Sequence, residues 1–529
     1  MCDTATPCAR CVSRQLTCRY RQKSETDTVY FKPESRSSNR DGPSTASSVF
    51  LRGLTNPESE TMMELFADDH AVNEKVPDLD VESKFSSMPP ALVSFDNIDF
   101  GPWSFVSFLG DEFSDFGASD DVSAASELTS SVPIFTDEGR QRLQYISDEI
   151  IRELGKSHAF LASYEPSYSD NFDEDLAREV FSAESLARFV SVFFRLSHIH
   201  FSLVHIPSFG YEDTPAALVL AVAIGGALRS APRDDAIASR RFSTVAEDYI
   251  FRHMQGIVVN ETASRPTKSM LYALQATIII HNIQFMRNDA QVRRRTLYHR
   301  LPALVAAVRQ LGLSRHKHSN TMIWDEFVYE ELCIRVGFWS AVSDWHQCGM
   351  FHISPQISIK EMTGDMPCRL ELWDASDPES FASKVHELGY NPPPQCFSSL
   401  CNFIELLMRD KLGEWQSIPV GSLAVSDLSA ATTALSSMVM SAHLNGTIMA
   451  TGAALLRAFD RWQALWAAVT AKLDAAALQR IGMARHSGDV NLLVRKLVEV
   501  AMSGEEQPSF LKRVGHDSLH ALYEFISNH

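Results

Sequence analysis

Apolar residues recur with helical spacing from about residue 139 to the end of this 529-residue chain. The first such stretch, GRQRLQYISDEIIREL, places five apolar residues on one helical face: Leu143, Ile146, Ile150, Ile151 and Leu154. Strand-like alternation is almost absent. The pattern predicts an all-α fold, with one large helical domain over residues 141–529 and a seam at the proline-rich residues 391–394.

Further helical stretches follow in sequence order: AESLARFVSVFFRLSHIHFSLVH, TPAALVLAVAIGGALRS, TKSMLYALQATIIIHNIQFM, VRRRTLYHRLPALVAAVRQLGL, IWDEFVYEELCIRVGFWSAVSDW and the Ala-rich residues 427–481. The longest apolar run, AALVLAVAIGGAL, has 13 residues. A membrane-spanning helix needs about 20. We therefore expect buried helices and no membrane partner.

Four of the nine cysteines stand within the first 18 residues: Cys2, Cys8, Cys11 and Cys18. No apolar run follows a basic start there, so we expect an intracellular chain whose thiols stay reduced. Crowded thiols in a reducing compartment are typical of metal sites, and C-x-x-C grips one tetrahedral ion from a tight turn. The spacing predicts that these four cysteines bind zinc.

Basic residues accompany the cysteines: Arg10, Arg14, Arg19, Arg21 and Lys23. This is the one compact basic element in a chain whose net charge is −18. A basic segment pinned by metal on an acidic protein indicates a site for a polyanion, and we expect DNA as the partner of residues 1–24. The alternative is a solvated tail with incidental cysteines.

Residues 25–140 are predicted to be a disordered linker, since stretches such as SRSSNRDGPSTASS cannot bury enough apolar surface to fold. Within it, residues 85–139 carry ten acids and no Lys or Arg. Seven aromatics are interleaved with the acids: Phe95, Phe100, Trp103, Phe105, Phe108, Phe113 and Phe116. This composition is typical of an activation segment that binds transcription coactivators. The alternative is an ordered arm that packs its aromatics on the helical domain.

The whole chain resembles the fungal zinc-cluster transcription factors, which join an N-terminal two-zinc, six-cysteine cluster to a helical regulatory region. Three stretches are similar to that region: FVSVFFRLSHIHFSLVHIPSF with its turn at residues 205–209, TLYHRLPALVAAVRQLGL, and the helix WDEFVYEELCIRVGFWSAVSDW followed by MPCRLELWDA at residues 366–375. The resemblance is best over residues 185–410.

In the family's cluster, a C-x-x-C and a basic run precede a Cys-Asp, a loop with Pro, a second C-x-x-C and a final Cys. Here Cys2, Cys8, Cys11 and Cys18 are similar to the second half of that motif, with Pro7 in the loop. Four thiolates hold at most one ordinary tetrahedral site, so we expect one zinc or none, and phosphate contacts rather than direct base readout.

The resemblance implies a nuclear regulator of RNA polymerase II genes, with a metabolic pathway or a specialised-metabolite gene cluster as its target. A homodimer through the helical domain is a further expectation. The alternative is a regulator without DNA-binding activity that acts through a DNA-binding partner. We expect no enzyme and no catalytic residue, although a helical metal-dependent enzyme would draw on two groups: His198, His200 and His205, and His346, Cys348 and His352.

Overall fold

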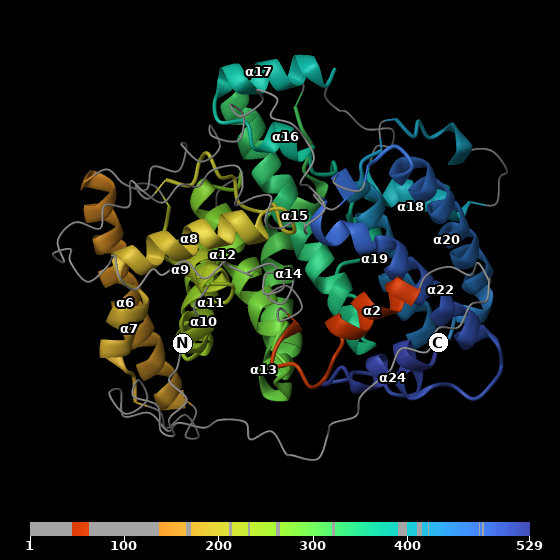
Figure 1. Cartoon of the computed structure of the whole chain (residues 1–529), viewed down its shortest axis with the longest axis horizontal. Coiled ribbons are helices and arrows are strands. Elements are labelled where there is room, and N and C mark those ends of the chain that lie inside the picture. Colours follow the sequence, from red (N-terminus) through yellow and green to blue (C-terminus); the bar gives the residue numbers. More distant parts are fainter. Residues whose placement is uncertain are drawn as a thin grey trace, which may run out of the picture. The chain divides into compact units, whose positions relative to one another are not determined.

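The structure is a computed structural model of the chain (Figure 1). It describes the following ranges: 45–62, 137–164, 171–210, 214–230, 233–260, 265–319, 323–389, 399–409, 415–421, 423–474, 477–478 and 481–529. These ranges belong to one compact unit.

All regular secondary structure in these ranges is helical, which confirms the predicted all-α fold. The elements before the long central helix are α2 (Thr45–Leu54), α6 (Asp137–Tyr164), α7 (Glu174–Val180), α8 (Ala183–Ser197), α9 (Ala216–Ala227), α10 (Arg233–Arg240), α11 (Ser243–Asn260), α12 (Lys268–Phe285), α13 (Ala290–Arg295), the π-helix η3 (Thr296–Arg300), α14 (Leu301–Gln310) and η4 (Leu313–Arg315). The central helix and those after it are α15 (Trp324–Phe351), η5 (Ile359–Glu361), α16 (Leu370–Trp373), α17 (Pro378–Glu387), α18 (Leu400–Met408), η6 (Trp415–Ser417), α19 (Val425–Leu444), α20 (Ile448–Thr470), η7 (Gly482–His486), α22 (Ser487–Met502), α23 (Ser509–Lys512) and α24 (His520–Asn528).

Helix α9 lies at the centre of the first half of the domain, and every one of its residues is buried. A helix that is apolar on all sides is stable only when other helices surround it. Its contact with α8 is close, because a Cβ atom at Gly226 would lie 1.8 Å from the carbonyl oxygen of Phe189. Only glycine at position 226 therefore allows the backbones of α8 and α9 to lie this close together.

The long helix α15 joins two hydrophobic cores (Figure 1). Its first half, including Phe327 and Leu332, packs in the core built from α6 to α12. Its second half, including Phe338 and Trp345, packs in the core built from α18 to α24. The predicted seam at residues 391–394 lies outside the described residues. In the described residues, α15 contributes to both cores.

A π-helical turn, η3, interrupts the helix that the sequence predicts without a break before Leu311. Pro302 follows this turn and has no N–H to donate into the preceding helical turn, which favours the wider winding. The turn brings Arg300 to Glu247, a fully buried carboxylate on α11, with Nε–Oε1 2.6 Å apart. Arg295 donates to the same carboxylate, at 2.9 and 2.8 Å.

A segment that the sequence analysis placed in the disordered linker has a packed position in the structure. Helix α2 lies against α22 and α24, and the turns after it, up to Met62, lie against residues 286–288 between α12 and α13 (Figure 1). Leu51 is buried in the second core, and Met62 is buried in a small third cluster. We call residues 50–62 the strap.

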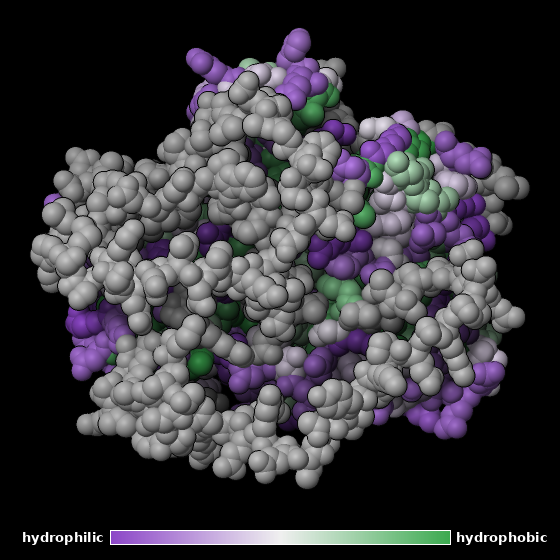
Figure 2. Space-filling view, in the orientation of Figure 1, coloured by the Kyte–Doolittle hydropathy of each residue, from purple (hydrophilic) through white to green (hydrophobic). Residues whose placement is uncertain are grey.

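The described surface in Figure 2 is mainly hydrophilic, most clearly at the top of the view, where α17 projects. Helix α17 turns its one buried residue, Phe381, onto Phe327 of α15, with ring centroids 4.6 Å apart. None of the helices in the described ranges is long and apolar enough to cross a bilayer.

Candidate functional site

The sequence-predicted zinc ligands and DNA contacts lie outside the described residues. They are Cys2, Cys8, Cys11 and Cys18, with Arg10, Arg14, Arg19, Arg21 and Lys23. The seven aromatics of the acidic segment also lie outside them. The binding of zinc, DNA and coactivators therefore stays a prediction.

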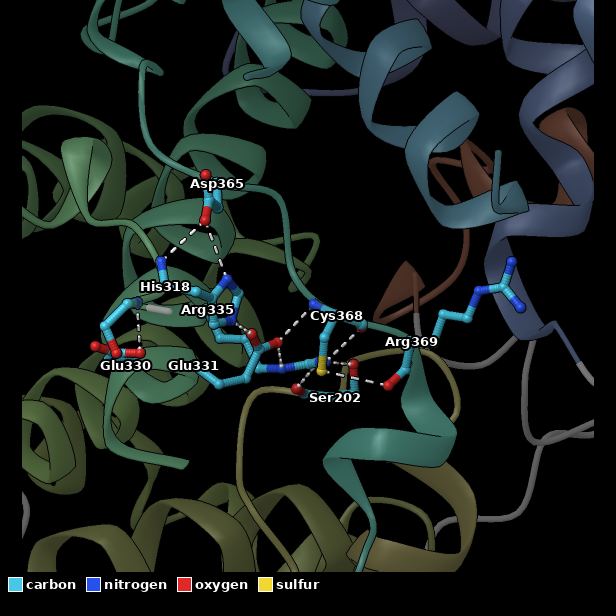
Figure 3. Close-up of polar contacts among 9 residues, drawn as sticks. Ser202, His318, Glu330, Glu331, Arg335, Asp365, Cys368 and Arg369 are labelled. Atoms are coloured by element: carbon cyan, nitrogen blue, oxygen red, sulfur yellow. Dashed lines mark hydrogen bonds and ion pairs between the residues drawn. The ribbon is translucent and has the colours of Figure 1, made fainter. Parts of the chain in front are cut away.

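Within the described residues, the strongest concentration of buried charge is an ionic network on α15 (Figure 3). Glu331 and Arg335 are one helical turn apart, so their side chains lie on the same face. Arg335 Nε donates to Glu331 Oε1 over 2.7 Å, and the two residues are 2 % and 0 % exposed. An ion pair this deeply buried needs further hydrogen bonds to offset its desolvation.

The second oxygen of Glu331 is held by His318, which precedes α15. His318 Nε2 lies 2.8 Å from Glu331 Oε2, and His318 Nδ1 lies 3.1 Å from Asp365 Oδ2 (Figure 3). The loop of Asp365 also pairs with the loop of His318 through its backbone, since the Asp365 N–H donates to His316 O over 2.9 Å. Gly364 permits this approach, because a Cβ there would lie 2.4 Å from His316 O.

Arg335 reaches two more segments of the chain. Its Nη1 donates to the carbonyl and hydroxyl of Ser202 at 2.7 and 2.6 Å, and its Nη2 donates to Cys368 O at 2.9 Å. The Cys368 N–H in turn donates to Glu331 Oε1 over 2.8 Å (Figure 3). The guanidinium carbon lies 4.5 Å from the ring centroid of Trp373. The network thus joins the segment after α8, helix α15 and the segment before α16.

These partners keep the network charged. Burial lowers the pKa of His318, but hydrogen bonds to Asp365 and Glu331 outweigh burial and raise this pKa to about 9. Burial raises the pKa of Glu331, but Arg335 and His318 outweigh it and lower this pKa to about 2. Burial and the Glu331 charge raise the pKa of the Cys368 thiol well above its usual range. At neutral pH the imidazolium and the Glu331 carboxylate are ionised, and the thiol is protonated.

The arrangement is suited to holding segments together and not to chemistry on a substrate. Its charged groups are buried and take up one another's hydrogen bonds, so none is free to activate a water or a nucleophile. A small cavity close by has a volume of about 10 Å³ and is lined by His205, Gln275 and Leu332 among others. That is room for one water molecule, whereas ligand pockets measure about 300–1,000 Å³.

Four of the five histidines and the cysteine of the metal-enzyme alternative have other partners. His198 Nε2 lies 2.8 Å from Asp374 Oδ1, and His205 Nδ1 lies 2.6 Å from Ser208 Oγ. His200 Nδ1 accepts from the Met483 N–H, Cys348 Sγ lies 3.7 Å from Asp344 Oδ1, and His352 Nε2 lies 2.9 Å from His443 Nδ1. Across the described ranges, no three His, Cys, Asp or Glu side chains form a group that could hold a metal ion.

The sequence identified the three stretches that resemble the family's helical region, but not the network residues that join these stretches in the fold. The spacing of Glu331 and Arg335 within an otherwise apolar helix was the available signal, because buried charges at i and i+4 indicate a paired site. His318 and Asp365 stand in loops 47 residues apart, and no local pattern connects them.

The fold and the network define a helical domain with a buried structural centre. Residues 190–423 match the family model of the fungal specific transcription factor domain. This region is therefore similar to a transcription factor domain, and the match includes every residue of the network. This finding confirms the predicted resemblance for residues 190–423, whereas residues 1–24 lie outside the match. No curated protein and no solved structure matches the chain.

Proposed function

We propose that this protein is a nuclear regulator of transcription by RNA polymerase II, which binds DNA through residues 1–24 and is controlled through its helical domain. The match of residues 190–423 to the fungal specific transcription factor domain carries the proposal. The resemblance to the family makes a metabolic pathway or a specialised-metabolite gene cluster the proposed target.

Zinc is the proposed organiser of the DNA-binding segment. Cys2, Cys8, Cys11 and Cys18 supply four thiolates, which suit one tetrahedral zinc. A metal-pinned turn would present the five basic side chains of this segment to phosphates. Native mass spectrometry of the peptide 1–25 should show one bound zinc, and two zincs would contradict a single site.

DNA binding by the full chain should depend steeply on salt. Five phosphate contacts imply a slope of about −4 to −5 for log affinity against log salt concentration. The double variant Cys8→Ser, Cys11→Ser should lose zinc and most DNA affinity. Cys401→Ser, a change at a buried cysteine of the helical domain, is the matched control and should keep both.

The alternative regulator, which reaches DNA through a partner protein, is favoured by one observation. The four N-terminal cysteines are similar to only the second half of the family's six-cysteine motif. Chromatin profiling of the tagged chain and of its Cys8→Ser, Cys11→Ser variant separates the two. Direct binding predicts that the variant leaves its genomic sites, and recruitment by a partner predicts that it stays.

A further inference from the structure

The strap, residues 50–62, contacts parts of the helical domain that are far apart in sequence. Phe50 stacks on His486 at the start of α22, with ring centroids 3.5 Å apart and an interplanar angle of 1°. Arg52 donates to Ser527 O at the end of α24 over 3.3 Å. The far end of the strap lies against the junction of α12 and α13, residues 286–288.

Two apolar side chains anchor the strap at its ends. Leu51 is 7 % exposed and packs in the second core. Met62 is 2 % exposed and packs in a cluster whose other buried members all come from the helical domain: Phe285, Leu297, Phe351 and Leu519. Phe285 and Phe351 also pack on each other, with ring centroids 5.5 Å apart. The Met62 site is therefore supported by contacts that do not involve the strap.

Between the anchors, the domain recognises the backbone of the strap. The Asn288 side-chain amide donates to Asn56 O and Ser59 O, at 3.2 and 2.5 Å. The Asn288 N–H donates to Glu60 O over 3.0 Å, and the Met62 N–H donates to Met286 O over 3.0 Å. These bonds, together with the antiparallel bridge between Thr61 and Arg287, satisfy carbonyl and amide groups of the strap.

The side chain that orients Asn288 is Arg293, which is 1 % exposed. Arg293 Nη2 donates to Asn288 Oδ1 and Arg287 O at 2.8 and 2.7 Å, and its Nη1 donates to Asp517 O at 2.8 Å. All three acceptors belong to the helical domain. The Asn288 amide oxygen is thus occupied by Arg293, which leaves the NH₂ group facing the strap.

We propose that this surface is a preformed docking site for the chain's own residues 50–62, and that the strap leaves it while the helical domain stays folded. In the sequence, 74 residues (63–136) separate the strap from α6, the next helix that the structure describes. Docking would hold the chain on either side of the strap, including the N-terminal cysteine segment, to the helical domain. The site selects the strap through two buried apolar side chains, Leu51 and Met62, and through hydrogen bonds from Asn288 to carbonyl groups of the strap.

The substitution Asn288→Asp tests the clamp with little change in shape. The new carboxylate keeps an acceptor for Arg293, but it replaces the NH₂ donor with an oxygen that faces Asn56 O and Ser59 O. The strap should detach. Met62→Lys should detach it by a different route, since a charge would enter the apolar site. Matched controls are Gln291→Glu, an exposed amide-to-acid change on α13, and Glu58→Lys, an exposed change within the strap.

Hydrogen exchange of the full chain is the measurement. Both test variants should speed exchange about tenfold or more in peptides covering 50–62 and 286–289, with α9 and α12 unchanged. Both controls should match the original chain. Unchanged exchange in the test variants would overturn the docking site, and loss of protection in α9 and α12 would show that the strap is an integral part of the fold.

A second experiment tests whether the site is preformed. A synthetic peptide of residues 45–62, added to the Met62→Lys chain, should restore protection at residues 286–289. The same peptide should fail on the Asn288→Asp chain, because the clamp itself is changed there. Failure on the Met62→Lys chain, or equal rescue of both, would overturn recognition by Asn288.

Discussion

At the scale of single residues, Glu331 occupies the key position of the helical domain. One oxygen of its carboxylate accepts from Arg335 Nε and from the Cys368 N–H, and the other contacts His318. One side chain thereby joins α15 to the loops on either side of it. A buried carboxylate with this many partners leaves uncompensated cations when its charge is removed.

The substitution Glu331→Gln should lower the free energy of unfolding by about 3–5 kcal/mol, because Arg335 would remain buried without its counter-ion and His318 would keep only Asp365. Denaturant unfolding followed by circular dichroism measures this change. The control is Glu499→Gln, which breaks the half-exposed Arg495–Glu499 pair on α22 and should change stability by no more than about 0.5 kcal/mol. Equal changes in the free energy of unfolding would show that the buried network stabilises the fold no more than an exposed ion pair does.

His318 makes stability depend on pH above neutrality. Its pKa in the folded chain is raised to about 9, against an ordinary value of 6.5. The stabilisation is therefore complete below pH 6.5 and is lost as the pH rises to about 9, with a slope of up to about 1.4 kcal/mol per pH unit. Unfolding midpoints measured from pH 6 to 9.5 should fall for the original chain. His318→Gln should remove this part of the slope, and an identical slope in both chains would contradict the assignment.

The residues of the network differ in how far the sequence could predict them. Glu331 and Arg335 share a helical face, which is a local property of the sequence. His318 and Asp365 meet only because the loop of one pairs with the loop of the other, and this depends on Gly364 having no side chain. Pairing of this kind is a property of the folded chain.

At the scale of elements, the contact between α8 and α9 is set by Gly226. The substitution Gly226→Ala should destabilise the domain by about 3 kcal/mol, because the new methyl group would collide with the Phe189 carbonyl. Gly256→Ala on α11 is the matched control, since nothing lies within 4 Å of a Cβ there, and alanine should stabilise the helix by about 0.5–1 kcal/mol. Thermal unfolding compares the two, and a stable Gly226→Ala domain would mean that α8 and α9 separate easily.

Apolar periodicity predicted the large helices well, including α9, α12, α15 and the Ala-rich α19 and α20, since each buries a long apolar surface. It missed the π-helix η3, because Pro302 changes the winding without changing the apolar pattern. It also missed the strap, whose packing relies on two apolar anchors and on backbone hydrogen bonds that leave no periodic signal.

At the scale of the whole molecule, the acidic segment should activate transcription independently of the helical domain, and the helical domain should fold independently of that segment. Residues 85–139 fused to an unrelated DNA-binding domain should activate a reporter gene. Replacing Phe100, Trp103, Phe105 and Phe108 with Ala should abolish activation, since each aromatic contributes about 1.5–3 kcal/mol when a coactivator groove buries it. In the full chain, the same four substitutions should leave the thermal unfolding of the helical domain unchanged. A silent fusion together with a destabilised full chain would instead identify an arm packed on the domain.

The position of the strap sets the length of the connecting segment between the cysteine segment and the helical domain. With the strap docked, 20 residues (25–44) separate residue 24 from α2, and they reach at most about 75 Å. With the strap free, the connecting segment extends to α6 through 112 residues (25–136), which reach at most about 400 Å. For a flexible connection of 20 rather than 112 residues, the effective concentration of the basic segment near the domain would be about 13-fold higher, since it falls as the −3/2 power of length. Docking and release would therefore change how far from the helical domain the proposed DNA-binding segment, residues 1–24, can act.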